Sequence, residues 1–127
     1  MATWHEVQQQ IRGSFVLDQD LEHEFVLTLE ITRDRHQRVM VRHYEALDAE
    51  LVEVRSAFAQ GNEVPAEQIL DENLTLPYGA IARHGRYLVV VQRVSLGTTT
   101  VEGVITAVTR VARVADWLES RHGGDRF

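Results

Sequence analysis

Hydrophobic and polar residues alternate in three segments in the first half of the chain, as is typical of strands that bury one face. The clearest alternation covers residues 21–31, and residues 15–17 are a candidate start of the same strand. Residues 37–44 and 51–58 repeat the pattern, and short polar turns join the segments, so we expect an antiparallel meander. The side chains expected to face the core are Phe25, Leu27, Leu29, Ile31, Val39, Val41, Val52, Val54, Ser56 and Phe58.

The N-terminal residues show helical spacing instead. Thr3 and Glu6 match a capping box, in which each side chain accepts a hydrogen bond from the backbone N–H of the other residue. Gly13 is the expected left-handed residue that ends this helix. The apolar residues on one face of the helix are Trp4, Val7 and Ile11.

Two further helices are predicted. Pro65 is expected as the first residue of a short helix that ends before residues 77–79. Thr99 and Glu102 match a second capping box, and Gly123 and Gly124 are expected to close the last helix. The apolar stripe of the short helix is Ala66, Ile69, Leu70 and Leu74. That of the last helix is Val101, Val104, Ile105, Val108, Val111, Ala112, Ala115 and Leu118.

A hairpin lies between these helices, with strands at residues 80–83 and 87–94. The apolar run at residues 88–91 predicts a strand that is covered on both faces. The predicted order is α-β-β-β-α-β-β-α, an α+β fold with an antiparallel sheet packed against helices. Residues 1–127 form one domain in this interpretation.

Composition excludes several kinds of chemistry. The chain has no cysteine and no lysine, which excludes disulfides, thiol nucleophiles, cysteine-ligated zinc and Schiff bases. Its net charge of −6 disfavours nucleic acids and anionic membranes as partners. The local basic cluster, Arg33, Arg35 and Arg38, is interpreted as a solvated turn. Residues 1–6 lack the pattern of a signal peptide, and the apolar runs are too short to cross a membrane, so we expect a cytoplasmic protein.

Two groups of polar residues are candidate metal sites. Four carboxylates alternate at Asp18, Asp20, Glu22 and Glu24. A calcium-binding loop starting at Asp18 needs glycine at its sixth position and glutamate at its twelfth. The sequence has His23 and Leu29 there, so we interpret the acidic residues as a solvated turn and strand edge.

The second group is His23 and His43, which can face each other on neighbouring strands with Glu45 nearby. One interpretation is the zinc site of a metal-dependent enzyme. We favour polar residues on the open face of a sheet. No serine lies in a G-x-S-x-G turn, and the chain has no glycine-rich phosphate loop. The sequence therefore predicts neither an enzyme nor a cofactor.

Aromatic residues indicate binding. Trp117 lies at the edge of the apolar stripe of the last helix, where protein interfaces place aromatic anchors; packing on the sheet is the alternative for both tryptophans. The candidate protein-binding residues are Trp4, Val52, Phe58 and Trp117.

Three motifs in the C-terminal half carry a family resemblance. Residues 73–79 read Asn-Leu-Thr-Leu-Pro-Tyr-Gly, residues 87–91 form the apolar strand, and residues 96–102 lead into the last helix through leucine, glycine, threonine and glutamate. In these motifs and in the order of its elements, the chain resembles the type III secretion chaperone-like superfamily, including its YbjN-type members. The resemblance implies a homodimer that holds an extended segment of a client protein, with no catalytic residues and no cofactor. Tyr78 has a packing role in this interpretation.

We therefore expect a non-enzymatic chaperone or adaptor that binds its client through sheet edges and the apolar rim of its helices. The alternative is a small-molecule sensory or regulatory domain with a pocket between the sheet and the helices.

Overall fold

The structure, a computed structural model, describes residues 1–122 and has three helices and six strands in that part of the chain. The elements are α1 (Trp4–Ser14), β1 (Leu17–Asp20), β2 (Glu24–Thr32), β3 (Arg35–Ala46), β4 (Ala49–Gln60), α2 (Ala66–Thr75), β5 (Ala80–His84), β6 (Tyr87–Ser95), the short 3₁₀ turn η1 (Leu96–Thr98) and α3 (Val101–His122). All strand pairs are antiparallel, in the order β1-β2-β3-β4-β6-β5. The predicted α+β class is confirmed.

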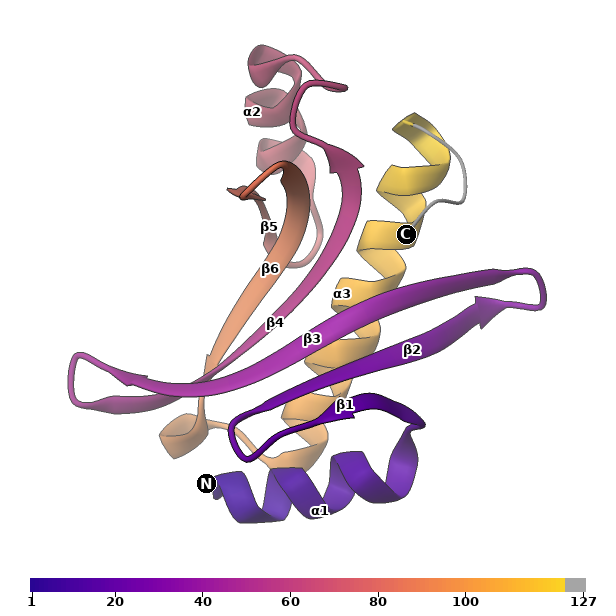
Figure 1. Cartoon of the computed structure of the whole chain (residues 1–127). Coiled ribbons are helices and arrows are strands. Elements are labelled where there is room, and N and C mark those ends of the chain that lie inside the picture. The colour runs from indigo at the N-terminus through magenta and orange to yellow at the C-terminus, as the bar shows by residue number, and fades with distance from the viewer. Residues whose placement is uncertain (123–127) are drawn as a thin grey trace.

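The long helix α3 lies along one face of the sheet, and α1 packs at one end of the same side (Figure 1). No helix of residues 1–122 covers the opposite face, which we call the open face (Figure 1). The predicted stripe of α3 supplies the core: its buried members are Val104, Val108, Val111, Ala112, Ala115 and Leu118. Each fully buried valine or leucine contributes roughly 1.5–3 kcal/mol relative to an exposed one. This face of α3 is therefore a main source of stability.

The strand pattern is confirmed where the alternation is strict. Phe25, Leu27, Val39, Val41 and the predicted inward residues of β4 are buried, whereas Leu29 and Ile31 are partly buried near the tip of the β2–β3 hairpin. All four residues at 88–91 are buried, as the unbroken apolar run predicts.

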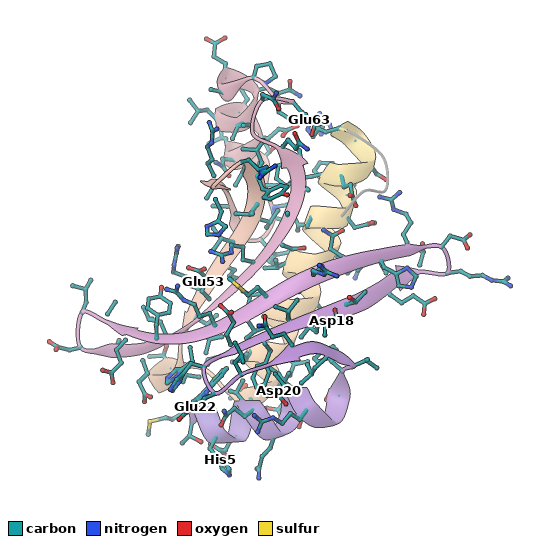
Figure 2. The ribbon with its side chains drawn as sticks, in the orientation of Figure 1. His5, Asp18, Asp20, Glu22, Glu53 and Glu63 are labelled. Atoms are coloured by element: carbon teal, nitrogen blue, oxygen red, sulfur yellow. The ribbon has the colours of Figure 1, made fainter. Side chains whose placement is uncertain are left out.

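The sheet has one strand more than predicted. Residues 21–23 are a turn, and β1 pairs with β2 as a separate edge strand. Two carboxylates of β1 hold it in place: Asp18 accepts a hydrogen bond of 2.6 Å from the Thr28 hydroxyl, and Asp20 forms an ion pair of 2.9 Å with Arg12 of α1. The acidic stretch is thus a strand edge and a turn, as interpreted, and Asp18, Asp20 and Glu22 follow one another along the chain instead of converging (Figure 2).

The capping box at Thr3 is confirmed, but the prediction for Gly13 is wrong. Gly13 lies inside α1, and the helix ends at Phe15, whose extended backbone donates its N–H to Ile11. A left-handed residue is unnecessary because Phe15 turns directly into an extended conformation.

The prediction of a second capping box, at Thr99 and Glu102, is also wrong, because the capping residue is one position further along the chain. Thr100 caps α3, since its hydroxyl accepts a hydrogen bond of 3.0 Å from the Gly103 N–H. Gly103 has no side chain to return the bond. A Cβ at this glycine would overlap the Thr99 hydroxyl, which explains why a glycine is accommodated in the first turn of the helix. The predicted closing glycines, Gly123 and Gly124, lie outside the described residues.

The helix α2 differs most from its prediction. Pro65 stands just before the helix, at the N-cap. Of the predicted apolar stripe, Ile69 is partly buried against the core, whereas Ala66 is exposed, Leu70 is 70% exposed and Leu74 is 88% exposed. The buried residue of α2 is Glu72, which accepts a hydrogen bond of 2.8 Å from His122 at the end of α3. Because α3 already occupies the apolar face of the sheet, α2 lies at its side.

The link between α2 and β5 has a structural role. The Asn73 amide accepts from the Ile81 N–H at 2.6 Å and donates to the Ile81 carbonyl at 3.2 Å, so it joins α2 to β5. Gly79 has φ +70°, and a Cβ there would lie 2.9 Å from the Val91 carbonyl oxygen. Gly85, in the β5–β6 turn, also has positive φ but open space around it.

These two glycines allow a matched prediction. Gly85→Ala is expected to lose about 1–2 kcal/mol from its left-handed backbone alone. Gly79→Ala is expected to lose about 1 kcal/mol or more beyond that, because the methyl group also meets β6. Urea denaturation measures both. An equal loss of unfolding free energy in the two variants would show that the close approach of Gly79 to β6 does not add to the cost of the substitution.

Candidate functional site

A hollow of about 480 Å³ lies on the open face, where β2, β3, β4, β5 and β6 contribute to one concave surface. Its floor is mainly apolar, and the two charged side chains in it, Arg38 and Arg55, are both cationic; the lining is Val26, Thr28, Arg38, Met40, Arg55, Ser56, Ala57, His84, Tyr87 and Val89. None of these lining residues carries a carboxylate. The hollow therefore suits an anion with an apolar body. It lies across the sheet from α3, whereas the sensory-domain alternative expects a pocket between sheet and helices.

Beside the hollow, Glu53 of β4 is held by two arginines on the open face. Its carboxylate lies 3.1 Å from Arg55 Nη1 and 2.9 Å from Arg93 Nη2, and its side chain is 5% exposed (Figure 2). Burial lowers the pKa of Arg55, and the charges of Arg42 and Arg93 lower it further, against the opposite effect of Glu53 and Glu24. The carboxylate is thus a counterion and not a free acid or base.

The predicted basic cluster at residues 33–38 divides between two places. Arg35 is not a solvated turn residue: its Nε lies 2.8 Å from Asp116 and its Nη2 lies 3.7 Å from Glu119, both on α3. This ion pair ties the start of β3 to the long helix. Arg38 lines the open-face hollow, and Arg33 is exposed.

A second concave surface, which we call the Trp117 groove, lies between α3 and the link that follows α2. It has a volume of about 480 Å³ and is lined by Pro77, Tyr78, Arg110, Arg113, Val114 and Trp117. Trp117 is 51% exposed and Tyr78 is 41% exposed. The guanidinium of Arg110 lies 4.2 Å from the Tyr78 ring centre, and that of Arg121 lies 5.3 Å from the Trp117 ring. Tyr78 is therefore at the surface, and not only a packing residue.

The four predicted protein-binding residues do not form one surface. Val52 and Phe58 are fully buried, and Trp4 is 8% exposed. These three side chains face the core because they follow the inward alternation of β4 and the inward face of α1, so they offer no contact surface. Trp117 is exposed, which leaves it as the one predicted residue that a partner can reach.

The sheet edges are less accessible than predicted. On β5, the outward N–H and carbonyl of Ile81 are already bonded to Asn73. On the other edge, β1 has four residues, two of them aspartates, and its pairing with β2 is irregular. Short and charged edges disfavour the addition of a further strand. Binding of a partner in a groove is thus favoured over the addition of a strand at a sheet edge.

The two histidines singled out in the sequence do meet. His23 Nδ1 and His43 Nδ1 lie 3.1 Å apart, but the nearby carboxylate is Glu50, at 3.1 Å from His43 Nε2, in place of the predicted Glu45. His43 is also not on the open face: its ring stacks on Trp4 of α1 at 4.8 Å. Within residues 1–122, no group of three or more histidine, aspartate or glutamate side chains is placed to hold a metal ion.

The sequence matches no model of a known protein family and no curated protein. Among the described residues, no helix is both long and apolar enough to cross a membrane.

Sequence reasoning missed the open-face hollow and most of the Trp117 groove. A signal for the first is present: Arg38, Met40 and Arg42 alternate with the inward residues of β3, and Arg55 does so on β4. The outward positions of neighbouring strands necessarily share a face. The groove had no such signal, because its residues come from two elements whose relative position depends on tertiary packing.

The Glu53 cluster supports a prediction on stability. Glu53→Gln is expected to lower the free energy of unfolding by about 2–3 kcal/mol, because it leaves the half-buried Arg55 without its counterion. Glu30→Gln, at an exposed position of β2, is the control and is expected to change it by less than about 0.5 kcal/mol. Chemical denaturation measures both variants. A loss at Glu53 no larger than that of the control would contradict the proposed counterion role.

Proposed function

We propose that this protein is a non-enzymatic, chaperone- or adaptor-like domain of the cytoplasm that holds an extended segment of a client protein in the Trp117 groove. The observation that carries the proposal is the exposure of two large aromatic side chains in that groove. Trp117 is 51% exposed and Tyr78 is 41% exposed, although the core has an ample apolar face of its own. Exposed apolar side chains that cluster on one region are typical of binding surfaces.

The groove also suggests the chemistry of the client. Arg110 and Arg113 line it, and Arg121 lies over the Trp117 ring, so three cations surround an aromatic anchor in a protein with a net charge of −6. A client segment with an apolar side chain for the groove and carboxylates beside it would complement this surface. The aromatic ring supplies contact area and the arginines supply orientation.

The groove can be tested with variants that keep the fold. Trp117→Ser is expected to reduce binding of an unfolded client at least tenfold, because a half-exposed aromatic anchor contributes more than about 1.4 kcal/mol to such contacts. The measurement is suppression of aggregation of a chemically unfolded test protein, together with quantitative co-purification from the native organism.

Leu47→Ser is the matched control, because Leu47 is fully exposed in the β3–β4 turn and lies outside the groove. It is expected to behave as the wild type. If Trp117→Ser and Leu47→Ser bind equally well, the groove is not the client site. If the wild type binds no polypeptide at all, the chaperone proposal fails and the open-face hollow becomes the basis of a small-molecule sensory function.

A homodimer is part of the proposal, as the family resemblance implies. Leu70 and Leu74 of α2 are the apolar residues that a second copy would cover, since their side chains contact little of their own domain. Leu74→Glu, which places a charge on this surface, is expected to convert dimers to monomers without unfolding the protein. Light scattering measures the mass, and circular dichroism measures the fold. A wild-type protein that is monomeric at high micromolar concentration would refute the dimer.

A further inference from the structure

The two Nδ1 atoms of His23 and His43 are as far apart as two ligands of one metal ion. The two Nδ1 atoms face each other at 3.1 Å, one from the turn before β2 and one from β3. Metal–imidazole bonds are about 2.0–2.1 Å long, so one ion bound to both atoms would have an N–metal–N angle of roughly 100°. This value lies between the angles of square-planar or octahedral coordination and that of tetrahedral coordination. The existing separation therefore suits two ligands of one ion, and the exposed His23 ring has to turn from its almost in-line contact for both lone pairs to reach it.

Each ring also has a carboxylate on its other nitrogen. Glu50 Oε1 lies 3.1 Å from His43 Nε2, and Glu22 Oε1 lies 3.7 Å from His23 Nε2. A carboxylate that accepts the Nε2–H leaves the lone pair on Nδ1, which is the atom that binds a metal. His43 thus has a partner that favours this tautomer, whereas Glu22 lies too far from the His23 ring for a hydrogen bond.

The site is held by the packing of α1. Trp4 stacks on the His43 ring at 4.8 Å with an interplanar angle of 11°, and its indole N–H donates to the Glu22 carbonyl at 2.8 Å. The His43 side chain is 11% exposed, whereas that of His23 is 59% exposed. One ligand is therefore fixed in the domain, and the other lies at the surface where an ion can enter.

We propose that His23 and His43 bind a divalent late transition-metal ion, of which Zn²⁺, Ni²⁺ and Cu²⁺ suit two imidazole ligands. Without a metal, His43 accepts on Nδ1 the hydrogen bond that His23 donates from its Nδ1–H; when an ion binds, this proton moves to Nε2 of His23 and the ion takes its place. With two protein ligands and water in the remaining positions, the site is labile, with a dissociation constant on the order of ten micromolar. The ion connects the turn before β2 to β3, next to the start of α1.

The experiment uses the full chain with any affinity tag removed. Isothermal titration with Zn²⁺ is expected to give one ion per chain. Thermal unfolding in excess Zn²⁺ is expected to rise by a few degrees, because the ion binds the folded state. Mg²⁺ is expected to have no effect, since it prefers oxygen ligands.

His23→Gln tests the site at its exposed ligand, where the substitution does not disturb the core. Its affinity for Zn²⁺ is expected to fall at least tenfold, and Glu50→Gln is expected to weaken binding by about tenfold through the orientation of His43. His36→Gln, at an exposed histidine elsewhere on β3, is the control and is expected to bind as the wild type. Wild-type affinity in His23→Gln, an equal loss in His36→Gln, or a stoichiometry of one ion per two chains would overturn the proposal.

Discussion

The packing of α3 against one face of the sheet is the constraint on which the rest of the fold depends. Its apolar stripe buries the inward residues of β3, β4 and β6, and α3 occupies this face together with α1, which packs at one end of it. The consequences are visible in α2, which lies at the side of the sheet and is held by polar contacts. Glu72 bonds to the end of α3 and Asn73 bonds to β5. The leucines of α2 then have no core to enter, and they become surface.

The same one-sided packing explains the open face. With no helix of residues 1–122 to cover it, its outward positions carry arginines whose charges are partly compensated by Glu53. Val89 and Val91 are nevertheless buried on this face, and Arg55 lies opposite Val91 in the pairing of β4 with β6. Long arginine side chains can cover apolar strand residues and still reach solvent. The result is a cationic hollow on a protein that is acidic overall. Net charge alone would have predicted the opposite preference for a ligand on this face.

Periodicity predicted the elements whose burial is decided locally. The alternation in β2, β3 and β4 and the stripe of α3 are each set by a single contact face, so the sequence is sufficient. Periodicity failed where the burial of an element depends on a neighbouring element. The stripe of α2 is a correct helical pattern, but whether it is buried depends on the space that α3 leaves. Thr99 and Thr100 are both plausible caps, and the difference depends on the chain path through η1. The candidate contact residues Val52 and Phe58 were wrong for a simpler reason, because their own alternation already placed them inside.

His43 shows that some of the missing information was present in the pattern. It stands two residues after Val41, so the alternation of β3 directs it to the core side, where α1 packs, and not to the open face. A histidine in that position needs partners for both ring nitrogens, because an unpaired buried nitrogen is costly. Glu50 satisfies one of them and His23 the other. The partner of the second nitrogen is another imidazole, which is itself more than half exposed. The contact that satisfies the buried ring therefore also brings a second nitrogen ligand to the surface, which is the arrangement on which the proposed metal site rests.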